Sequence, residues 1–311
     1  MFTGSITAAR LRKSVLSVPP LARRADLALD HEQNRRLLAH MRAGGVTTFL
    51  YGGNANLYNI GVTDFGARLD MLEALAEPDD WMLPSIGPDF GKACDQIDLL
   101  KPRAFPTAMI LPLRFPSTPQ GVARGIGRLA ERYGKPVIVY VKDEGYIAPG
   151  DLAALVKEGS VCTIKYAIIR TDPKVDPTLS AILKSVDPAI VVSGIGERPV
   201  PEHAGAFGIK AFTSGAVCIA PRLSMAILDA VAAGDQQRIV KLRETFLPLE
   251  DLRDRYSPLR VLHEAVRLAG IAETGPIPPY LSNIDDPDVL RAIEAVARRL
   301  READTGAAAA A

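Results

Sequence analysis

Short apolar runs rich in β-branched residues alternate along this chain with longer stretches in which apolar positions recur every three or four residues. The short runs are typical of strands buried on both faces, whereas the periodic stretches are typical of amphipathic helices. The pattern predicts strands over residues 14–18, 46–51, 81–86, 107–113, 136–141, 161–170, 189–193 and 210–214. A helix is predicted after each strand, and such an alternation over about 230 residues indicates an α/β fold, a (β/α)8 TIM barrel.

A doubly wound open sheet would show the same alternation of strands and helices. Two features count against it, because no G-x-G-x-x-G motif follows the first strand and further helices follow the eighth strand and its helix. These later helices are predicted over residues 236–247, 249–253, 258–268 and 287–301. We therefore expect a barrel over residues 10–233, a C-terminal helical module over residues 234–303 and a disordered tail over residues 304–311.

The charge balance and the cysteines narrow the kinds of partner. The 37 basic and 36 acidic residues give a formal net charge of +1, which removes the main electrostatic argument for nucleic acid or an anionic membrane as a partner. The cysteines lack C-x-x-C spacing and the histidines are scattered, so we expect no disulfide framework and no metal site. No signal peptide and no membrane-spanning run is visible. We therefore expect a soluble cytoplasmic protein that binds a small molecule and needs no cofactor.

A single lysine, Lys165, interrupts the apolar run of the sixth predicted strand. Alternation along a strand places Lys165 on the face opposite Cys162 and Ile164, which suit the apolar layer between barrel and helices. Lys165 is therefore expected to point into the barrel, near the strand ends where active sites of this fold lie. Burial lowers the pKa of an amine, and a neutral amine attacks a ketone to form a Schiff base. The alternative is a lysine whose ammonium group reaches water.

Tyr140 ends the fifth predicted strand and offers a phenol one strand before the lysine. Imine chemistry moves protons between the amine, the carbinolamine and a substrate hydroxyl, and a phenol beside a cation can relay them. The alternative is a core tyrosine with a satisfied hydroxyl. Lys142 shares the parity of Tyr140 and is the rival Schiff-base residue, but it lies in a polar run typical of solvated loops.

Loops after other predicted strands offer groups that could bind an acidic substrate. A glycine pair follows the second strand, where backbone N–H groups could cradle a carboxylate, although an ordinary tight turn would use the same glycines. A serine and a glycine follow the eighth strand, and single arginines follow the fourth and sixth strands, either as carboxylate partners or as solvated surface residues. The binding candidates are Gly53, Asn54, Ser214, Gly215, Arg114 and Arg170.

The order of these features resembles the dihydrodipicolinate synthase and N-acetylneuraminate lyase family of class I aldolases over nearly the whole chain, from residue 14 to about residue 303. Its most specific parts are PVIVY at 136–140, similar to the family's strand ending in the catalytic tyrosine, and TIKYA at 163–167, similar to its Schiff-base strand. The resemblance implies a tetrameric barrel in which Lys165 forms an imine with pyruvate or another 2-oxo acid. Aldol addition, cleavage or dehydration would then proceed through the enamine.

Three places depart from the family pattern. The family's G-T-T-G-E loop, which holds the carboxylate of the keto acid, is replaced by GGNAN at 52–56, so both threonine hydroxyls are absent. Leu113-Arg114 stands where the family has a tyrosine pair, including the tyrosine supplied across the dimer interface. Residues 141–145 lack the arginine that dihydrodipicolinate synthase places shortly after its catalytic tyrosine. These differences argue against a standard dihydrodipicolinate synthase.

The sequence therefore predicts a lyase that acts on a 2-oxo acid, by pyruvate-type aldol cleavage or condensation or by dehydration, through a Schiff base on Lys165. Aldolase and dehydratase remain alternatives within this class. A second hypothesis is a catalytically impaired barrel that binds a 2-oxo acid metabolite as a sensor or regulator, and the lost threonines and tyrosine favour it. The resemblance and the C-terminal helices also predict a homotetramer or homodimer.

Overall fold

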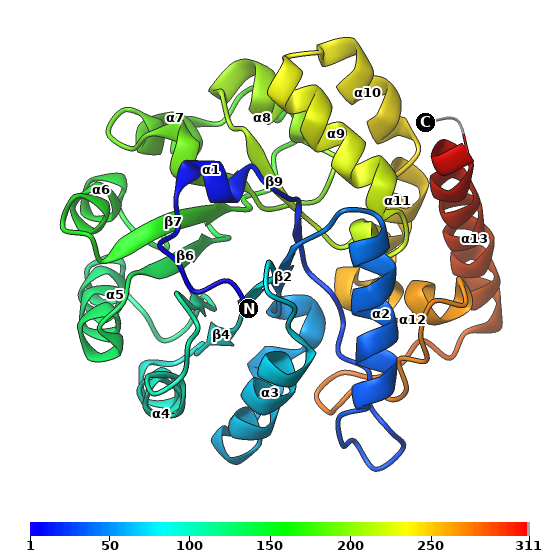
Figure 1. The fold of residues 1–311 in the computed structure, drawn as a ribbon. Helices are drawn as coiled ribbons and strands as arrows, with labels where there is room; N and C mark the ends of the chain where they lie inside the picture. Colours follow the sequence, from blue (N-terminus) through cyan, green and yellow to red (C-terminus); the bar gives the residue numbers. More distant parts are fainter. Residues whose placement is uncertain (310–311) are drawn as a thin grey trace.

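The computed structural model describes residues 1–309 as a barrel of short parallel strands surrounded by helices (Figure 1). The strands are β1 (Leu16–Ser17), β2 (Thr48–Leu50), β3 (Trp81–Leu83), β4 (Ser85–Ile86), β5 (Met109–Ile110), β6 (Val137–Val141), β7 (Val161–Tyr166), β8 (Val191–Ser193) and β9 (Ala211–Ser214). Each lies within a predicted strand, which confirms the TIM barrel. The prediction was wrong about the length of the lysine strand, because β7 ends at Tyr166 and Ile169 is exposed.

The third barrel strand is divided in two at Pro84, and this division explains how nine short strands form one barrel. The strand order is β3-β2-β1-β9-β8-β7-β6-β5-β4, so the two halves, β3 and β4, lie at its two ends. On one side Leu83 pairs with Leu50 of β2, and on the other Ser85 pairs with Met109 of β5. Because a proline has no N–H group to donate to the ladder, the break falls at Pro84 while the barrel stays nearly closed.

A helix follows each barrel strand and covers its outer side (Figure 1). Most of these helices begin at a side-chain cap or a proline, as in α4, where Asp89 accepts a hydrogen bond from the Lys92 N–H group. The helices are α2 (His31–Ala43), α3 (Val62–Leu75), α4 (Phe90–Leu100), α5 (Pro119–Tyr133), α6 (Pro149–Lys157), α7 (Pro177–Leu183), α8 (Val200–Phe207) and α9 (Pro221–Ala233). The short helix α1 (Ala8–Leu11) packs against the short 3-10 helix η3 (Pro188–Ile190), which directly precedes β8. It therefore lies at the end of the barrel opposite the predicted site.

Four helices follow the barrel: α10 (Gln236–Glu244), α11 (Leu247–Tyr256), α12 (Pro258–Leu268) and α13 (Pro287–Ala309). Helix α12 packs against the short 3-10 helix η1 (Gly53–Ala55) after β2, and α13 packs against α9 and α12. The C-terminal helices therefore reach the carboxyl end of the barrel strands. Helix α13 continues through Ala309, and residues 310–311 lie outside the described residues. The disorder expected from residue 304 stays a prediction.

The core fills the barrel interior and the layer between strands and helices. Its largest fully buried side chains include Trp81 of β3, Tyr51 after β2 and Phe212 of β9. Packing of this kind holds the strand ends in place, and those ends position the candidate site. Across residues 1–309, no helix combines the length and apolar character needed to cross a lipid bilayer.

Candidate active site

Tyr140 and Lys165 lie side by side because they are register partners on neighbouring parallel strands, β6 and β7. Partners in register direct their side chains to the same face of a sheet. The Lys165 Nζ atom lies 4.3 Å from the centroid of the Tyr140 ring. The next residue, Tyr166, points to the outer face, where its hydroxyl donates to Asp176 at 2.7 Å. The side chain of Lys165 therefore points into the barrel.

The surroundings of Lys165 favour its neutral form. The residue is only 5% exposed. Burial, together with the positive charges of Lys142 and Arg253, lowers the pKa of Lys165 to about 7. A neutral, nucleophilic amine is therefore accessible near neutral pH. Lys142, the rival Schiff-base residue, is exposed at the surface and acts on this site through its charge.

Gly194, directly after β8, leaves the space that the stem of Lys165 occupies. A Cβ atom at this position would lie 2.7 Å from the Tyr166 carbonyl oxygen and 3.0 Å from Lys165 Cγ. Both distances are shorter than normal van der Waals contacts. The glycine therefore lets β8 approach the lysine strand closely, beside the stem of Lys165.

Tyr140 is half-buried beneath the amine. Burial and the nearby negative charge of Asp143 raise the pKa of Tyr140 to about 12, although the positive charge of Arg253 acts in the opposite direction. The phenol is therefore protonated at neutral pH and can donate its proton. A neutral amine and a protonated phenol in contact are the two groups that carbinolamine formation and breakdown require.

The loop after β2 offers unused hydrogen-bond donors. Within the described chain, the N–H groups of Gly53 and Asn54 have no hydrogen-bond partner. The Asn54 amide donates to the Val18 carbonyl oxygen at 2.8 Å, which ties the loop to the end of β1. Asn56, in the left-handed region with φ of 55°, donates to the Pro278 carbonyl oxygen at 3.2 Å. The loop is held from both sides while its first N–H groups stay available.

Ser214 and Gly215, at the end of β9, have different surroundings. Ser214 is fully buried, and its Oγ accepts a hydrogen bond from the Val217 N–H group at 2.8 Å. Its hydroxyl thus holds the turn that follows β9. Gly215 lies beside the Asn54 amide, since a Cβ atom there would be 3.0 Å from Asn54 Nδ2. Of the two residues, Gly215 is the one that adjoins the β2 loop.

The two predicted arginines are bound to carboxylates and are not brought together with Lys165. Arg114 is largely exposed and forms a bidentate ion pair with Asp143. Arg170 donates to Asp176 at 2.9 Å and to Glu144 at 2.6 Å. Asp176 also caps α7 and accepts from Tyr166, so Arg170 belongs to a network on the outer side of β7. The proposed site therefore does not include Arg170 or Ser214.

A buried charged cluster behind Gly215 escaped the sequence prediction. Arg253 of α11 donates to Glu250 at 2.7 Å, and Glu197, after β8, accepts from Ser224 at 2.5 Å. Burial and the nearby Glu250 raise the pKa of Glu197 to about 7. An acidic residue after a barrel strand is a signal that sequence reasoning could have used for Glu197. Arg253 gives no such signal, because a Glu and an Arg three residues apart usually mark a solvated helix face.

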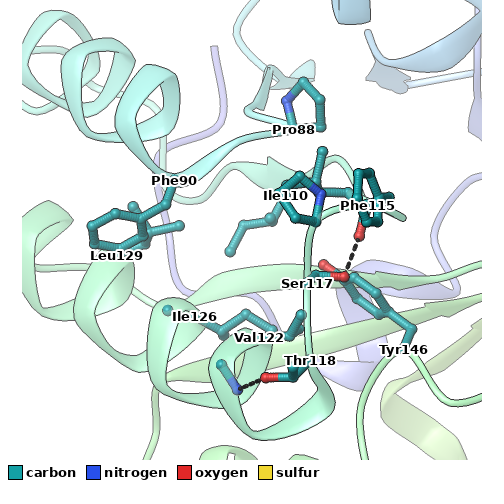
Figure 2. Close-up of a pocket in the computed structure, with 14 residues that line it drawn as sticks. Pro88, Phe90, Ile110, Phe115, Ser117, Thr118, Val122, Ile126, Leu129 and Tyr146 are labelled. Carbon is teal, nitrogen blue, oxygen red and sulfur yellow. Dashed lines mark hydrogen bonds between the residues drawn. The ribbon is translucent and has the colours of Figure 1, made fainter.

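An apolar groove of about 540 Å³ lies outside the barrel mouth, over α4, α5 and the loop that joins β5 to α5 (Figure 2). Phe90, Ile126 and Leu129 form one side, and Tyr146 lies across from them. The Ser117 hydroxyl donates to the Leu113 carbonyl oxygen at 3.0 Å and holds the loop at the edge of the groove. Lys165 does not line this groove, so it is separate from the candidate active site.

Comparison with solved structures identifies the fold. Dihydrodipicolinate synthase from Bacillus clausii superposes with a TM-score of 0.81 at 21% identity, over 93% of this chain and 97% of that chain. YagE, a prophage protein of the dihydrodipicolinic acid synthase family from E. coli K12 solved in complex with pyruvate, superposes with a TM-score of 0.79 at 16% identity, over 92% of this chain and 97% of that chain. The chain has the dihydrodipicolinate synthase fold.

Sequence comparison finds one further similar protein. A Streptomyces coelicolor protein named probable 5-dehydro-4-deoxyglucarate dehydratase 2 is 26% identical over 184 residues, which are 58% of this chain. The match spans 55% of that protein, about half of its length. No family model matches the sequence. A dihydrodipicolinate synthase fold with a dehydratase among its relatives agrees with the prediction of a family member that differs from a standard dihydrodipicolinate synthase.

Proposed function

We propose that the protein is a lyase or dehydratase that acts on a 2-oxo acid through a Schiff base on Lys165. The observation that carries this proposal is the contact between the Lys165 amine, whose pKa burial and neighbouring cations lower to about 7, and the protonated phenol of Tyr140. The fold of a structure solved with pyruvate supports the substrate class, and the dehydratase relative supports the reaction class.

In the proposed reaction, the neutral Lys165 amine attacks the carbonyl carbon of the 2-oxo acid. Tyr140 donates a proton to the developing alkoxide and recovers one from the nitrogen, which gives the neutral carbinolamine. It then protonates the carbinolamine hydroxyl group, which leaves as water and gives an iminium ion. The resulting tyrosinate accepts a proton from the adjacent carbon, which gives an enamine and restores the phenol. The enamine allows either elimination of a neighbouring hydroxyl group as water or reversible cleavage of a carbon–carbon bond.

The β2 loop is the proposed carboxylate site. The N–H groups of Gly53 and Asn54 have no other partner in the described chain, and Gly215 lies next to this loop. Backbone amides would thus replace the threonine hydroxyls of the family pattern in binding the carboxylate. They cannot replace those hydroxyls as proton relays, because an amide N–H does not exchange its proton in catalysis. Tyr140 and the substrate's own hydroxyl groups would therefore carry the relay.

The test is turnover of a panel of 2-oxo acids, with product analysis that separates water loss from carbon–carbon cleavage. Wild-type protein should convert at least one member, and Lys165→Met should lose the activity while remaining folded. Lys142→Met is the matched control and should remain active. Turnover that persists in Lys165→Met would contradict the proposal.

A sensor or regulator of 2-oxo acids is the second candidate, because the threonine pair is absent and Arg114 is bound to Asp143 at the surface. Thermal-shift measurements with the same panel separate the two functions. Stabilisation by a 2-oxo acid that the protein never converts would support the sensor, whereas turnover would exclude it.

We also propose that the protein is a homodimer or homotetramer. The family resemblance places the segment at Leu113-Arg114 at a dimer interface, and this segment borders the apolar groove of Figure 2. Phe115, next to it, is 86% exposed. An exposed phenylalanine beside an apolar groove is typical of a surface that a partner covers.

A further inference from the structure

Tyr58 is a phenol at the barrel mouth that the reaction proposed above does not use. It lies in the short 3-10 helix η2 (Leu57–Asn59), which follows the β2 loop after a left-handed turn at Asn56. The Lys92 ammonium group donates to the Tyr58 carbonyl oxygen at 2.9 Å and holds this segment in place. A Cβ atom on Gly53 would lie 3.8 Å from Tyr58 Cε2. The ring therefore lies against the β2 loop.

Packing of the β2 loop places Tyr58 on the same side of the barrel mouth as Tyr140. Gly52 lies against Met109, since a Cβ atom on Gly52 would be 2.9 Å from Met109 Cε. Met109 is the register partner of Ile138 on β6. Ile138 and Tyr140 are two residues apart on one strand and so share a face. The loop that carries the Tyr58 ring thus lies over the strand that carries Tyr140.

Electrostatic effects identify the groups around the Tyr58 hydroxyl. Burial raises the pKa of Tyr58, and among its neighbours the Tyr140 phenol has the largest effect in the same direction. Tyr146 and Asp143 raise this pKa further, whereas the positive charge of Arg114 lowers it. Within the described chain the Tyr58 hydroxyl has no hydrogen-bond partner. It is therefore a protonated, uncommitted phenol close to Tyr140, with a cation near enough to stabilise its anion.

Dehydration and carbon–carbon cleavage make opposite demands on the second hydroxyl group of a substrate. In both reactions this group is on the fourth carbon, next to the nucleophilic third carbon of the enamine. Its loss as water requires an acid that protonates it, whereas cleavage requires a base that removes its proton. Because burial opposes ionisation of Tyr58, this phenol is suited to act as the acid and is a poor base.

We propose that Tyr58 is the general acid for the hydroxyl group on the fourth carbon of a 4-hydroxy-2-oxo acid, and that it makes the protein a dehydratase rather than an aldolase. This inference rests on the proposed function and decides between the two reactions left open there. The enamine electrons form a double bond between the third and fourth carbons, and the carbon–oxygen bond breaks. The phenol proton leaves with the hydroxyl group as water, and the iminium ion is restored. The half-buried tyrosinate then recovers a proton from solvent.

The test uses 4-hydroxy-2-oxopentanoate, which has an uncharged end, and 4-hydroxy-2-oxoglutarate, which has an acidic end. Ultraviolet absorbance of the unsaturated product measures water loss, and pyruvate release measures carbon–carbon cleavage. Borohydride trapping with pyruvate, which has no hydroxyl group to lose, measures adduct formation in parallel. Tyr58→Phe is the test variant, and it should keep its melting temperature because the hydroxyl has no partner. Tyr146→Phe removes another half-buried phenol, which lines the apolar groove, and is the matched control.

Tyr58→Phe should slow water loss about 100-fold and leave adduct formation with pyruvate unchanged, while Tyr146→Phe should change neither. Unchanged water loss in Tyr58→Phe, or an equal loss in both variants, would overturn the inference. A parallel fall in adduct formation would show a structural role for Tyr58 and would overturn it as well. So would a wild type that forms the adduct but loses water from neither hydroxy acid. Wild-type protein that forms no adduct on Lys165 would instead overturn the proposed function, and this inference with it.

Discussion

At the scale of single residues, the candidate site depends on holding a lysine where water cannot solvate its charge. Tyr140 covers one side of the amine, and Gly194 allows β8 to pack against its stem. Such an arrangement lowers the stability of the fold, because the charged amine is better solvated in the unfolded chain. A buried lysine of this kind is more reactive but makes the fold less stable, and the loss in the free energy of unfolding can be measured.

Replacing Lys165 with methionine should stabilise the protein. The folded pKa is lowered to about 7 from 10.5, so between these values the unfolded chain binds more protons and wild-type stability rises with pH. Lys165→Met should therefore raise the free energy of unfolding by about 2–4 kcal/mol at pH 7. The gain should shrink as pH rises towards 9.5. Urea denaturation at several pH values measures it, with Lys157→Met on the exposed side of α6 as the control.

Gly194→Ala should harm both the fold and the site. The new Cβ atom would meet the Tyr166 carbonyl oxygen at 2.7 Å and Lys165 Cγ at 3.0 Å. Overpacking of this kind should cost about 1–3 kcal/mol in the free energy of unfolding and slow adduct formation on Lys165. Gly150→Ala, in the first turn of α6, where no atom lies within 4 Å of the added Cβ, should leave adduct formation unchanged and should not destabilise the fold. Equal effects of the two variants in urea denaturation would contradict the packing argument.

At the scale of elements, the sequence predicts the barrel strands well because each is a continuous apolar run between breakers. The lysine strand was predicted too long, since Ala167 and Ile168 extend the apolar run although β7 has ended at Tyr166. The inward direction of Lys165 follows from strand alternation, which is a local property. The position of Arg253 cannot be predicted from a local property, because it depends on how α11 packs against the end of the barrel. Only the tertiary structure shows this packing.

Helix α3 offers a test of the helical assignment that does not involve the site. Gly66 lies in its interior, and a Cβ atom there would have no neighbour within 4 Å. Gly66→Ala should therefore raise the free energy of unfolding by about 0.5–1 kcal/mol through helix propensity alone. Thermal or urea denaturation measures the gain, and a loss of stability would show that the helix packs against something at this position.

At the scale of the whole molecule, the C-terminal helices and the groove over α4 and α5 place two different surfaces around the barrel mouth. Helix α12 packs against the Gly53–Ala55 segment, and α11 carries Arg253 towards Gly215. The groove lies outside the mouth, beside Phe115. The surface formed by the C-terminal helices belongs to the proposed substrate site. The groove over α4 and α5 is the surface that we propose for self-association.

Phe115→Asp should therefore reduce the oligomeric state. Phe115 is 86% exposed, and a charge at this position would have to be desolvated in an apolar interface. Sedimentation velocity should show a dimer or tetramer for wild type and a smaller species for the variant. Tyr280→Asp, at a residue that is 95% exposed in the C-terminal part, is the control and should leave the mass unchanged. A wild-type protein that sediments only as a monomer would contradict the prediction.

Reduction of the protein with borohydride in the presence of pyruvate, followed by peptide mapping in a mass spectrometer, tests the Schiff base on Lys165 directly. We expect one covalent adduct, on Lys165, that forms faster as pH rises through about 7, where burial and neighbouring cations set the pKa of this amine. Lys142→Arg should still form the adduct. An adduct on Lys142, or none on Lys165 with pyruvate or any other 2-oxo acid, would contradict the proposed Schiff base.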